Sequence, residues 1–273
     1  IIYDSHEYHP EGFAEHFSWG RNIVTKLIYT YEKRLAKQAD YIVTVNEILV
    51  EKFKKYNDNV VLLPNYPVIA NDTVNKRYGS KPIFTYVGGL TKDRGILKIL
   101  EGIKLVEDDY KYVFIGNFSD SNFQNEVKNY VGENLKNKDI VFTGQIPHKE
   151  VFNYLEESYG GFVLLQPNNW RYINSEPIKL FEYMISKTAV IGADYPMIKN
   201  IVNKCNCGIL AKADSPEAIA DAIKNLGKNS EMAKKMGERG HEQVKKYYNW
   251  DIVKDKLMSM YLELEKYTNK KNG

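Results

Sequence analysis

The residues best suited to chemistry lie between Ile173 and Gly192, in the stretch INSEPIKLFEYMISKTAVIG. A polar run, Asn174-Ser175-Glu176-Pro177, precedes apolar residues at helical spacing, and Pro177 is expected in the first turn of that helix. A helix start attracts anions, because its amide groups are unpaired and its dipole is positive there. Lys179 and Glu182 occupy the first two turns, so the segment predicts a site for a phosphate attached to a hydroxyl-rich group.

A second cluster follows the apolar strand expected at Ile83–Val87. Gly88 and Gly89 would let a ligand approach the backbone closely, although a plain tight turn is the alternative interpretation. Arg94 follows near the same carboxyl edge of the sheet and can donate two hydrogen bonds to a phosphate. A cation at a helix start opposes the dipole, and a nearby anion would resolve that conflict.

The N-terminal segment Asp4-Ser5-His6-Glu7-Tyr8-His9-Pro10-Glu11 is dense in titratable groups. The irregular spacing of these groups argues against a metal cluster. Two interpretations remain: the segment is a surface loop whose histidines occur there by chance, or His6 faces a substrate from the end of a strand. The polar loop Gln166–Asn174 has a similar ambiguity. Its Trp170 and Arg171 would line a sugar pocket or would simply pack the loop.

Composition excludes several classes of protein. The 273 residues carry a net charge of only +3, which argues against nucleic-acid binding. The G-x-G-x-x-G, G-K-[ST] and serine or cysteine nucleophile motifs are absent, which argues against dehydrogenases, P-loop NTPases and covalent hydrolases. Two basic clusters are interpreted as solvated helix faces or as contacts to an anionic membrane: Lys33, Arg34 and Lys37, and then Lys52, Lys54 and Lys55.

The cellular location is expected to be the cytoplasm, with peripheral contact to the membrane as the further option. Cys205 and Cys207 are too close for an easy disulfide and too few for a zinc site, so we expect reduced thiols. No apolar run reaches the length of a membrane span, and no signal peptide is visible. Ile1-Ile2-Tyr3-Asp4 reads as a strand already in progress, so we expect a fragment of a longer protein.

The element pattern predicts an α/β protein with two Rossmann-like parts. Residues 1–68 are expected to form a partial N-terminal domain, residues 69–80 a linker, residues 81–248 a complete C-terminal domain, and residues 249–273 a returning helix. Strands that alternate with helices predict a parallel sheet covered on both faces. The strands are expected at 1–4, 41–45, 60–63, 83–87, 112–115, 140–142, 161–165, 189–191 and 208–210. The helices are expected at 22–38, 47–56, 95–106, 121–135, 148–157, 176–187, 195–203, 216–226, 230–247 and 251–267.

Taken together, these segments resemble the GT4 family of retaining glycosyltransferases, which have the GT-B fold. The resemblance covers almost the whole chain and depends on the order and spacing of individually weak motifs. They are Tyr3–Glu7, Ala39–Asn46, Leu63–Asn65, Val87–Gly95, Phe142–Gly144, Pro177–Met184 and Asn249–Asp251. The family often carries two glutamates eight residues apart in the Pro177–Met184 motif. Here Glu182 stands at the second position and Asn174 at the first, while Glu176 is only six residues before Glu182. Many members of the family have an arginine directly after the first glycine of the Val87–Gly95 motif, and this chain has Gly89 at that position.

The resemblance implies transfer of a sugar from a nucleotide-diphosphate donor to a glycan or lipid-linked acceptor, in bacterial surface polysaccharide synthesis. It implies catalytic roles for His6, Arg94 and Lys179. Donor contacts are implied for Gly88, Gly89, Asn174, Ser175, Glu176 and Glu182, of which Glu182 would accept from ribose hydroxyls. No metal or other cofactor is expected. The alternatives are a non-catalytic nucleotide-sugar-binding module and another GT-B enzyme, an epimerase or a phosphorylase.

Overall fold

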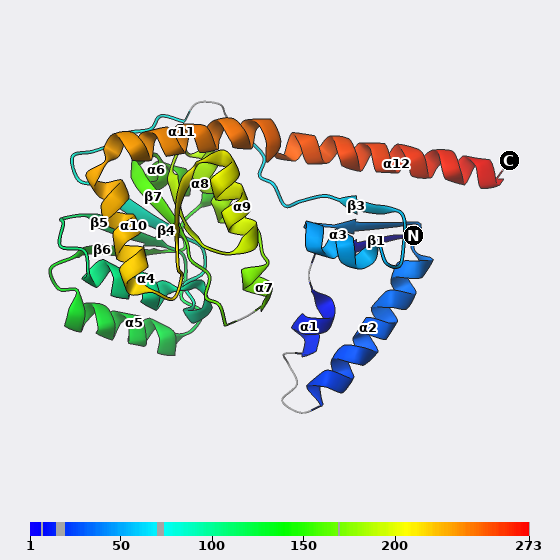
Figure 1. Cartoon of the computed structure of the whole chain (residues 1–273), viewed down its shortest axis with the longest axis horizontal. Coiled ribbons are helices and arrows are strands. Elements are labelled where there is room, and N and C mark those ends of the chain that lie inside the picture. The colour runs from blue at the N-terminus through cyan, green and yellow to red at the C-terminus, as the bar shows by residue number, and fades with distance from the viewer. Residues whose placement is uncertain (7, 15–19, 70–73, 169, 273) are drawn as a thin grey trace. The chain divides into compact units, whose positions relative to one another are not determined.

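The computed structural model divides the chain into two compact units. Unit 1 comprises Ile1–Val68 with Trp250–Gly273, and unit 2 comprises Ile69–Asn249. Residues 1–6, 8–14, 20–69, 74–168 and 170–272 are described, so Glu7, part of the N-terminal titratable segment, and part of the expected linker lie outside the description. Figure 1 shows the elements of each unit.

Unit 1 is built on a three-stranded parallel sheet in the order β1 (Ile2–Ser5), β2 (Tyr41–Thr44), β3 (Val60–Leu62). Successive strand residues face opposite sides of a sheet, and the core follows that rule. Ile42 packs in a cluster with Ala36, Leu49 and Phe53, whereas Val43 packs with Leu63, Val253 and Met260. The helices of the unit are α1 (His9–Ala14), α2 (Arg21–Gln38), α3 (Glu47–Phe53) and α12 (Trp250–Asn272).

Unit 2 is a doubly wound domain with a six-stranded parallel sheet in the order β6-β5-β4-β7-β8-β9. Its strands are β4 (Ile83–Val87), β5 (Lys111–Ile115), β6 (Asp139–Gly144), β7 (Ser158–Val163), β8 (Ala189–Ala193) and β9 (Gly208–Ala211). Its helices are η1 (Lys92–Arg94), α4 (Ile96–Lys104), α5 (Ser121–Asn134), α6 (His148–Glu157), α7 (Trp170–Ile173), α8 (Ile178–Ile185), α9 (Pro196–Cys205), α10 (Pro216–Lys228) and α11 (Ser230–Tyr247).

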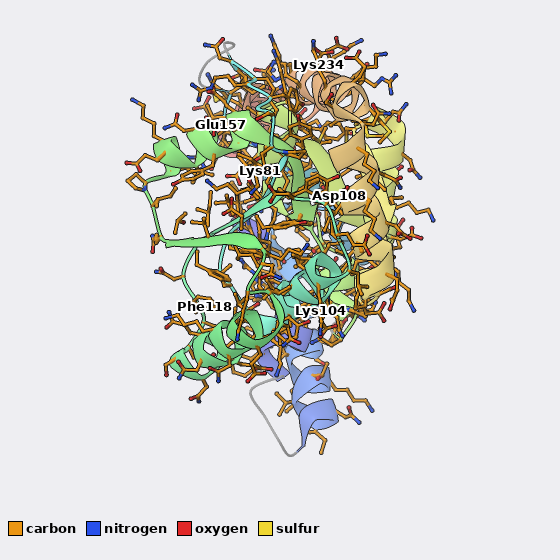
Figure 2. The ribbon with its side chains drawn as sticks, turned by 90° about the vertical axis from the view of Figure 1, so that its left-hand side faces the viewer. Lys81, Lys104, Asp108, Phe118, Glu157 and Lys234 are labelled. Carbon is orange, nitrogen blue, oxygen red and sulfur yellow. The ribbon has the colours of Figure 1, made fainter. Side chains whose placement is uncertain are left out.

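The strand order places a topological switch point between β4 and β7. The chain runs outward from β4 to β6 on one side and from β7 to β9 on the other. In open parallel sheets, ligands bind in the crevice outside the carboxyl ends of the strands at such a point. Figure 2 shows Lys81, which precedes β4, well separated from Phe118, which lies beyond the carboxyl end of β5. The segments that follow β4 and β7 therefore define where a site is expected.

Several local features differ from the sequence expectations, and β7 spans Ser158–Val163 where a strand was expected at 161–165. Pro177 has an extended conformation and caps α8 instead of occupying its first turn, because the helix begins at Ile178. The polar loop after β7 contains the short helix α7, and the N-terminal loop contains α1. Both helices have six residues or fewer, too short for a helical period to be recognised in the sequence.

Candidate functional site

Two cations converge on one glycine at the carboxyl end of β4. Gly88 has φ of 118°, in the region that favours glycine. A Cβ atom built there would lie 3.1 Å from Arg94 Nη1 and 3.4 Å from Lys179 Nζ. The same Arg94 nitrogen would lie 3.5 Å from a Cβ on Gly89. The structure therefore brings together four of the residues singled out in the sequence, although they come from two separate segments.

Arg94 is held by the turn in which it lies. It ends η1, and its backbone amide donates to Thr91 Oγ1 at 3.2 Å. Gly95 follows with φ of 79°, and a Cβ there would lie 2.3 Å from the Leu164 carbonyl oxygen beyond β7. Only glycine allows this close approach without displacing the backbone, so Gly95 fixes the turn against the segment after β7. Arg94 thus precedes α4 and does not lie inside its first turn.

Lys179 lies over an aromatic ring instead of beside a carboxylate. Its Nζ is 3.9 Å from the centre of the Tyr86 ring, a cation–π arrangement. Burial first, and then the Arg94 charge, lower the pKa of Lys179 well below its ordinary value, while Glu182 opposes the shift. Burial also raises the pKa of Tyr86 to about 12, and Arg94 opposes that shift. Among the described residues, neither Arg94 nor Lys179 forms an ion pair with a carboxylate, so an anion between them would satisfy both.

Helix α8 is positioned by Tyr183. The backbone amide of Val87, at the end of β4, donates to the Tyr183 hydroxyl at 3.0 Å. That hydroxyl also lies 3.3 Å from the Thr85 carbonyl oxygen. Burial raises the pKa of this phenol well above its ordinary value, so it is neutral and able to donate. These contacts hold α8, whose start no side chain caps, against the end of β4.

The residues before α8 have mainly local partners. Asn174 Nδ2 donates to the Trp170 carbonyl at 2.9 Å, and Ser175 Oγ donates to the Tyr172 carbonyl at 3.0 Å. Both side chains therefore close the C-terminal end of α7. Burial and then Cys205 raise the pKa of the Tyr248 phenol, and the nearby Glu176 charge adds to that rise. The donor contacts expected of these three residues remain predictions.

Glu182 has a partner that sequence reasoning missed. His148 Nε2 lies 3.0 Å from Glu182 Oε1, and the Glu182 side chain is only 16% exposed. His148 is the first residue of α6, directly after the segment that follows β6. The available signal was Pro147-His148 at a helix start beyond a strand, which places a histidine at the carboxyl edge. Nothing in the sequence indicated that Tyr86 and Tyr183 belong to the site, because tyrosines at apolar positions of a strand or helix are usually interpreted as core residues.

His6 belongs to unit 1, where its Nε2 lies 2.8 Å from Asp4 Oδ1. Both side chains border a cavity of about 510 Å³ whose other lining residues are Ile2, Val43, Leu63, Asn65, Trp250, Leu257, Met260 and Tyr261. The remaining predicted site residues lie in unit 2. The expected role of His6 against a donor bound to unit 2 therefore stays a prediction.

No group of three or more His, Cys, Asp or Glu side chains among the described residues is arranged to hold a metal ion. No helix within the described ranges combines the length and apolar character that crossing a membrane requires. Cys205 and Cys207 are free and buried.

The six-stranded doubly wound sheet of unit 2 and the small parallel sheet of unit 1 are typical of an α/β protein of the GT-B type. The sequence comparison agrees, because the family "Glycosyl transferases group 1" matches residues 69–243. The chain belongs to this family of glycosyltransferases. The expected family and fold class are thereby confirmed.

Known relatives are similar over most of this chain. It is 24% identical to an uncharacterized glycosyltransferase of Methanocaldococcus jannaschii, over 90% of this chain and 64% of that protein. It is 25% identical to the capsular polysaccharide biosynthesis glycosyltransferase CapM of Staphylococcus aureus, over 79% of this chain and 52% of that protein. The chain therefore spans about half to two-thirds of the length of these relatives.

A solved structure supports the fold at lower identity. HepE of Anabaena, in complex with UDP, superposes with a TM-score of 0.75 at 11% identity, covering 96% of this chain and 72% of that one. At this identity the likeness shows the fold alone. UDP binding is a property of HepE, and whether it extends to this chain is a matter for proposal.

Proposed function

We propose that this chain is part of a retaining glycosyltransferase that moves a sugar from a nucleotide-diphosphate donor to a glycan or lipid-linked acceptor. The observation that carries the proposal is the pair of cations, Arg94 and Lys179, that meets at Gly88 without a carboxylate partner among the described residues. Breaking a bond between sugar and diphosphate develops negative charge on the diphosphate oxygens. Preorganised cations stabilise that charge most effectively, because they need not reorganise during the reaction.

The nucleoside part of the donor is assigned to Glu182. An ionised carboxylate only accepts hydrogen bonds, and ribose offers two hydroxyl donors. Glu182 lies one turn after Lys179 on α8, so a ligand with its diphosphate at the cations would extend its ribose along that helix. A role for His6 toward the donor sugar belongs to the same proposal, and no protein nucleophile is required. HepE, which has the same fold, was solved with UDP, so UDP is the first nucleotide to test.

A thermal-shift screen with UDP-, GDP- and ADP-sugars tests the assignment, because a ligand that binds only the folded state raises the melting temperature. We expect one nucleotide to raise it, and Glu182→Ala to remove most of that increase. Hydrolysis or transfer of the selected donor then separates an enzyme from a binding module. If Glu182→Ala leaves the shift unchanged, the nucleoside assignment is wrong.

The acceptor is proposed to belong to bacterial surface polysaccharide synthesis. CapM, a relative over 79% of this chain, is named for capsular polysaccharide biosynthesis. The many Lys, Asn and Tyr residues are typical of bacteria with low-GC genomes, which supports the same assignment. A direct test offers radiolabelled donor with lipid-linked acceptors extracted from such a bacterium and looks for labelled lipid.

Peripheral contact with the cytoplasmic face of a membrane is proposed for α2. Ile23, Leu27 and Tyr31 recur every four residues on this helix and are 63%, 66% and 63% exposed. The helix has five basic residues and one acidic residue, Glu32, which is buried in an ion pair with Lys52 at 2.6 Å. An apolar stripe flanked by cations suits an anionic bilayer surface. Because Lys52 pairs with Glu32, it is not available for the membrane contact suggested for the cluster of Lys52, Lys54 and Lys55.

A further inference from the structure

His148 and Glu182 come from different parts of unit 2 but share one contact. His148 begins α6 and Glu182 lies in the second turn of α8, and the 3.0 Å separation joins His148 Nε2 to Glu182 Oε1. The two side chains differ sharply in exposure, with 71% for His148 and 16% for Glu182. Carboxylate oxygens with so little access to solvent need protein hydrogen-bond partners, so the histidine contact serves Glu182 more than it serves the exposed histidine.

Hydrogen bonds hold the segment that precedes His148 in place. Asn117, beyond β5, and Gln145, beyond β6, exchange two hydrogen bonds of 3.0 Å each, from Asn117 Nδ2 to Gln145 Oε1 and from Gln145 N to Asn117 Oδ1. The His148 ring also packs edge-on against Phe152 one turn later, with centroids 5.2 Å apart and an interplanar angle of 87°. These contacts restrict the imidazole before any ligand arrives.

We propose that His148 is a positioning residue for Glu182, which it holds in the rotamer that receives the ribose of a nucleoside diphosphate. An ionised carboxylate has about four lone-pair positions. His148 uses one of them when Nε2 carries the proton, which leaves the others for the two ribose hydroxyls. The histidine therefore assists the ribose instead of competing with it, because it removes rotamer freedom that binding would otherwise have to remove.

This inference rests on the proposed function, and its test measures the dissociation constants of UDP and of inorganic pyrophosphate by calorimetry. If GDP or ADP ranks first in the screen, that nucleotide replaces UDP. We expect His148→Ala to weaken nucleotide binding about threefold to tenfold, the value of one hydrogen bond, and to leave pyrophosphate binding unchanged. His148→Gln keeps an N–H donor and should restore at least half of the loss. Lys149→Ala, an exposed neighbour on α6, is the matched control and should have no effect.

The Glu182→Ala background separates positioning from direct contact. If His148 acts through the carboxylate, adding His148→Ala to Glu182→Ala weakens nucleotide binding no further. An additional loss in that background, or an equal loss of pyrophosphate binding, would overturn the positioning role. If Glu182→Ala alone has no effect, or if none of the three nucleotides binds, the proposed function fails first. If Glu182→Ala weakens binding and His148→Ala does not, only this inference is lost.

Discussion

Arg94 is expected to supply the strongest single contact to a diphosphate. Charge-assisted hydrogen bonds contribute about 1.5–3 kcal/mol, so Arg94→Ala should weaken binding of the donor nucleotide about 10- to 100-fold by calorimetry. Lys92→Ala is the control, because Lys92 lies in the same turn but pairs with Glu126 at 3.3 Å. Equal losses for the two variants would mean that general charge, and not the Arg94 position, attracts the ligand.

Lys179 is expected to destabilise the unliganded protein. Its pKa is lowered in the folded state, so between that value and the ordinary lysine value the unfolded chain binds more protons, and stability rises with pH. Below that window the cost of holding the charge is fully present. Lys179→Met should therefore raise the melting temperature at neutral pH, because the variant has no charge to bury.

The gain from Lys179→Met should shrink as the pH approaches 10 and should coincide with weaker nucleotide binding. Lys199→Met serves as the control, because Lys199 is half exposed and pairs with Asp194 at 2.9 Å. A melting temperature that falls in Lys179→Met at neutral pH would contradict the direction of the pKa shift.

Among the secondary-structure elements, α2 offers the sharpest prediction. Ile23→Gln combined with Leu27→Gln should reduce the fraction of protein that sediments with vesicles containing anionic lipid by at least about tenfold. Burial of each apolar side chain in the bilayer would stabilise the bound state by about 1.5–3 kcal/mol. Leu262→Gln is the matched control, since Leu262 is 53% exposed on α12, whose charges have both signs. Equal binding to vesicles without anionic lipid, or a dimer that the substitutions dissociate, would contradict membrane contact.

The periodicity of the sequence predicted the long elements well, because hydrophobic spacing reflects burial directly. The range of α11 at Ser230–Tyr247 and that of β4 at Ile83–Val87 agree with the residues expected. Short elements such as α7 depend on local hydrogen bonds and carry no period. The proximity of Arg94 and Lys179 was predicted because both lie in segments that follow strands of one parallel sheet. The His148–Glu182 contact joins residues 34 positions apart, and no local pattern records such a tertiary contact.

At the scale of the whole molecule, nucleotide binding is expected to reside in unit 2 alone. Arg94, Lys179, Glu182 and His148 all lie within Ile69–Asn249, which has its own six-stranded sheet. A protein consisting of residues 69–249 should bind the donor nucleotide with nearly the affinity of the whole chain, within the few tenths of a kcal/mol typical of independent sites. Calorimetry on both proteins tests this, with circular dichroism to verify folding. A folded but non-binding unit 2 would show that unit 1 contributes to the site.

The cations at Gly88, which have no carboxylate partner among the described residues, have a practical consequence for handling the protein. A site that attracts diphosphate also attracts sulfate and orthophosphate, which are common in purification buffers and crystallisation solutions. Any such ion would compete with the proposed nucleotide and raise the melting temperature by mass action, so a nucleotide added later would appear to bind weakly. Buffer anions can thus mask a true donor, and ligand screens belong in a buffer whose anion is chloride.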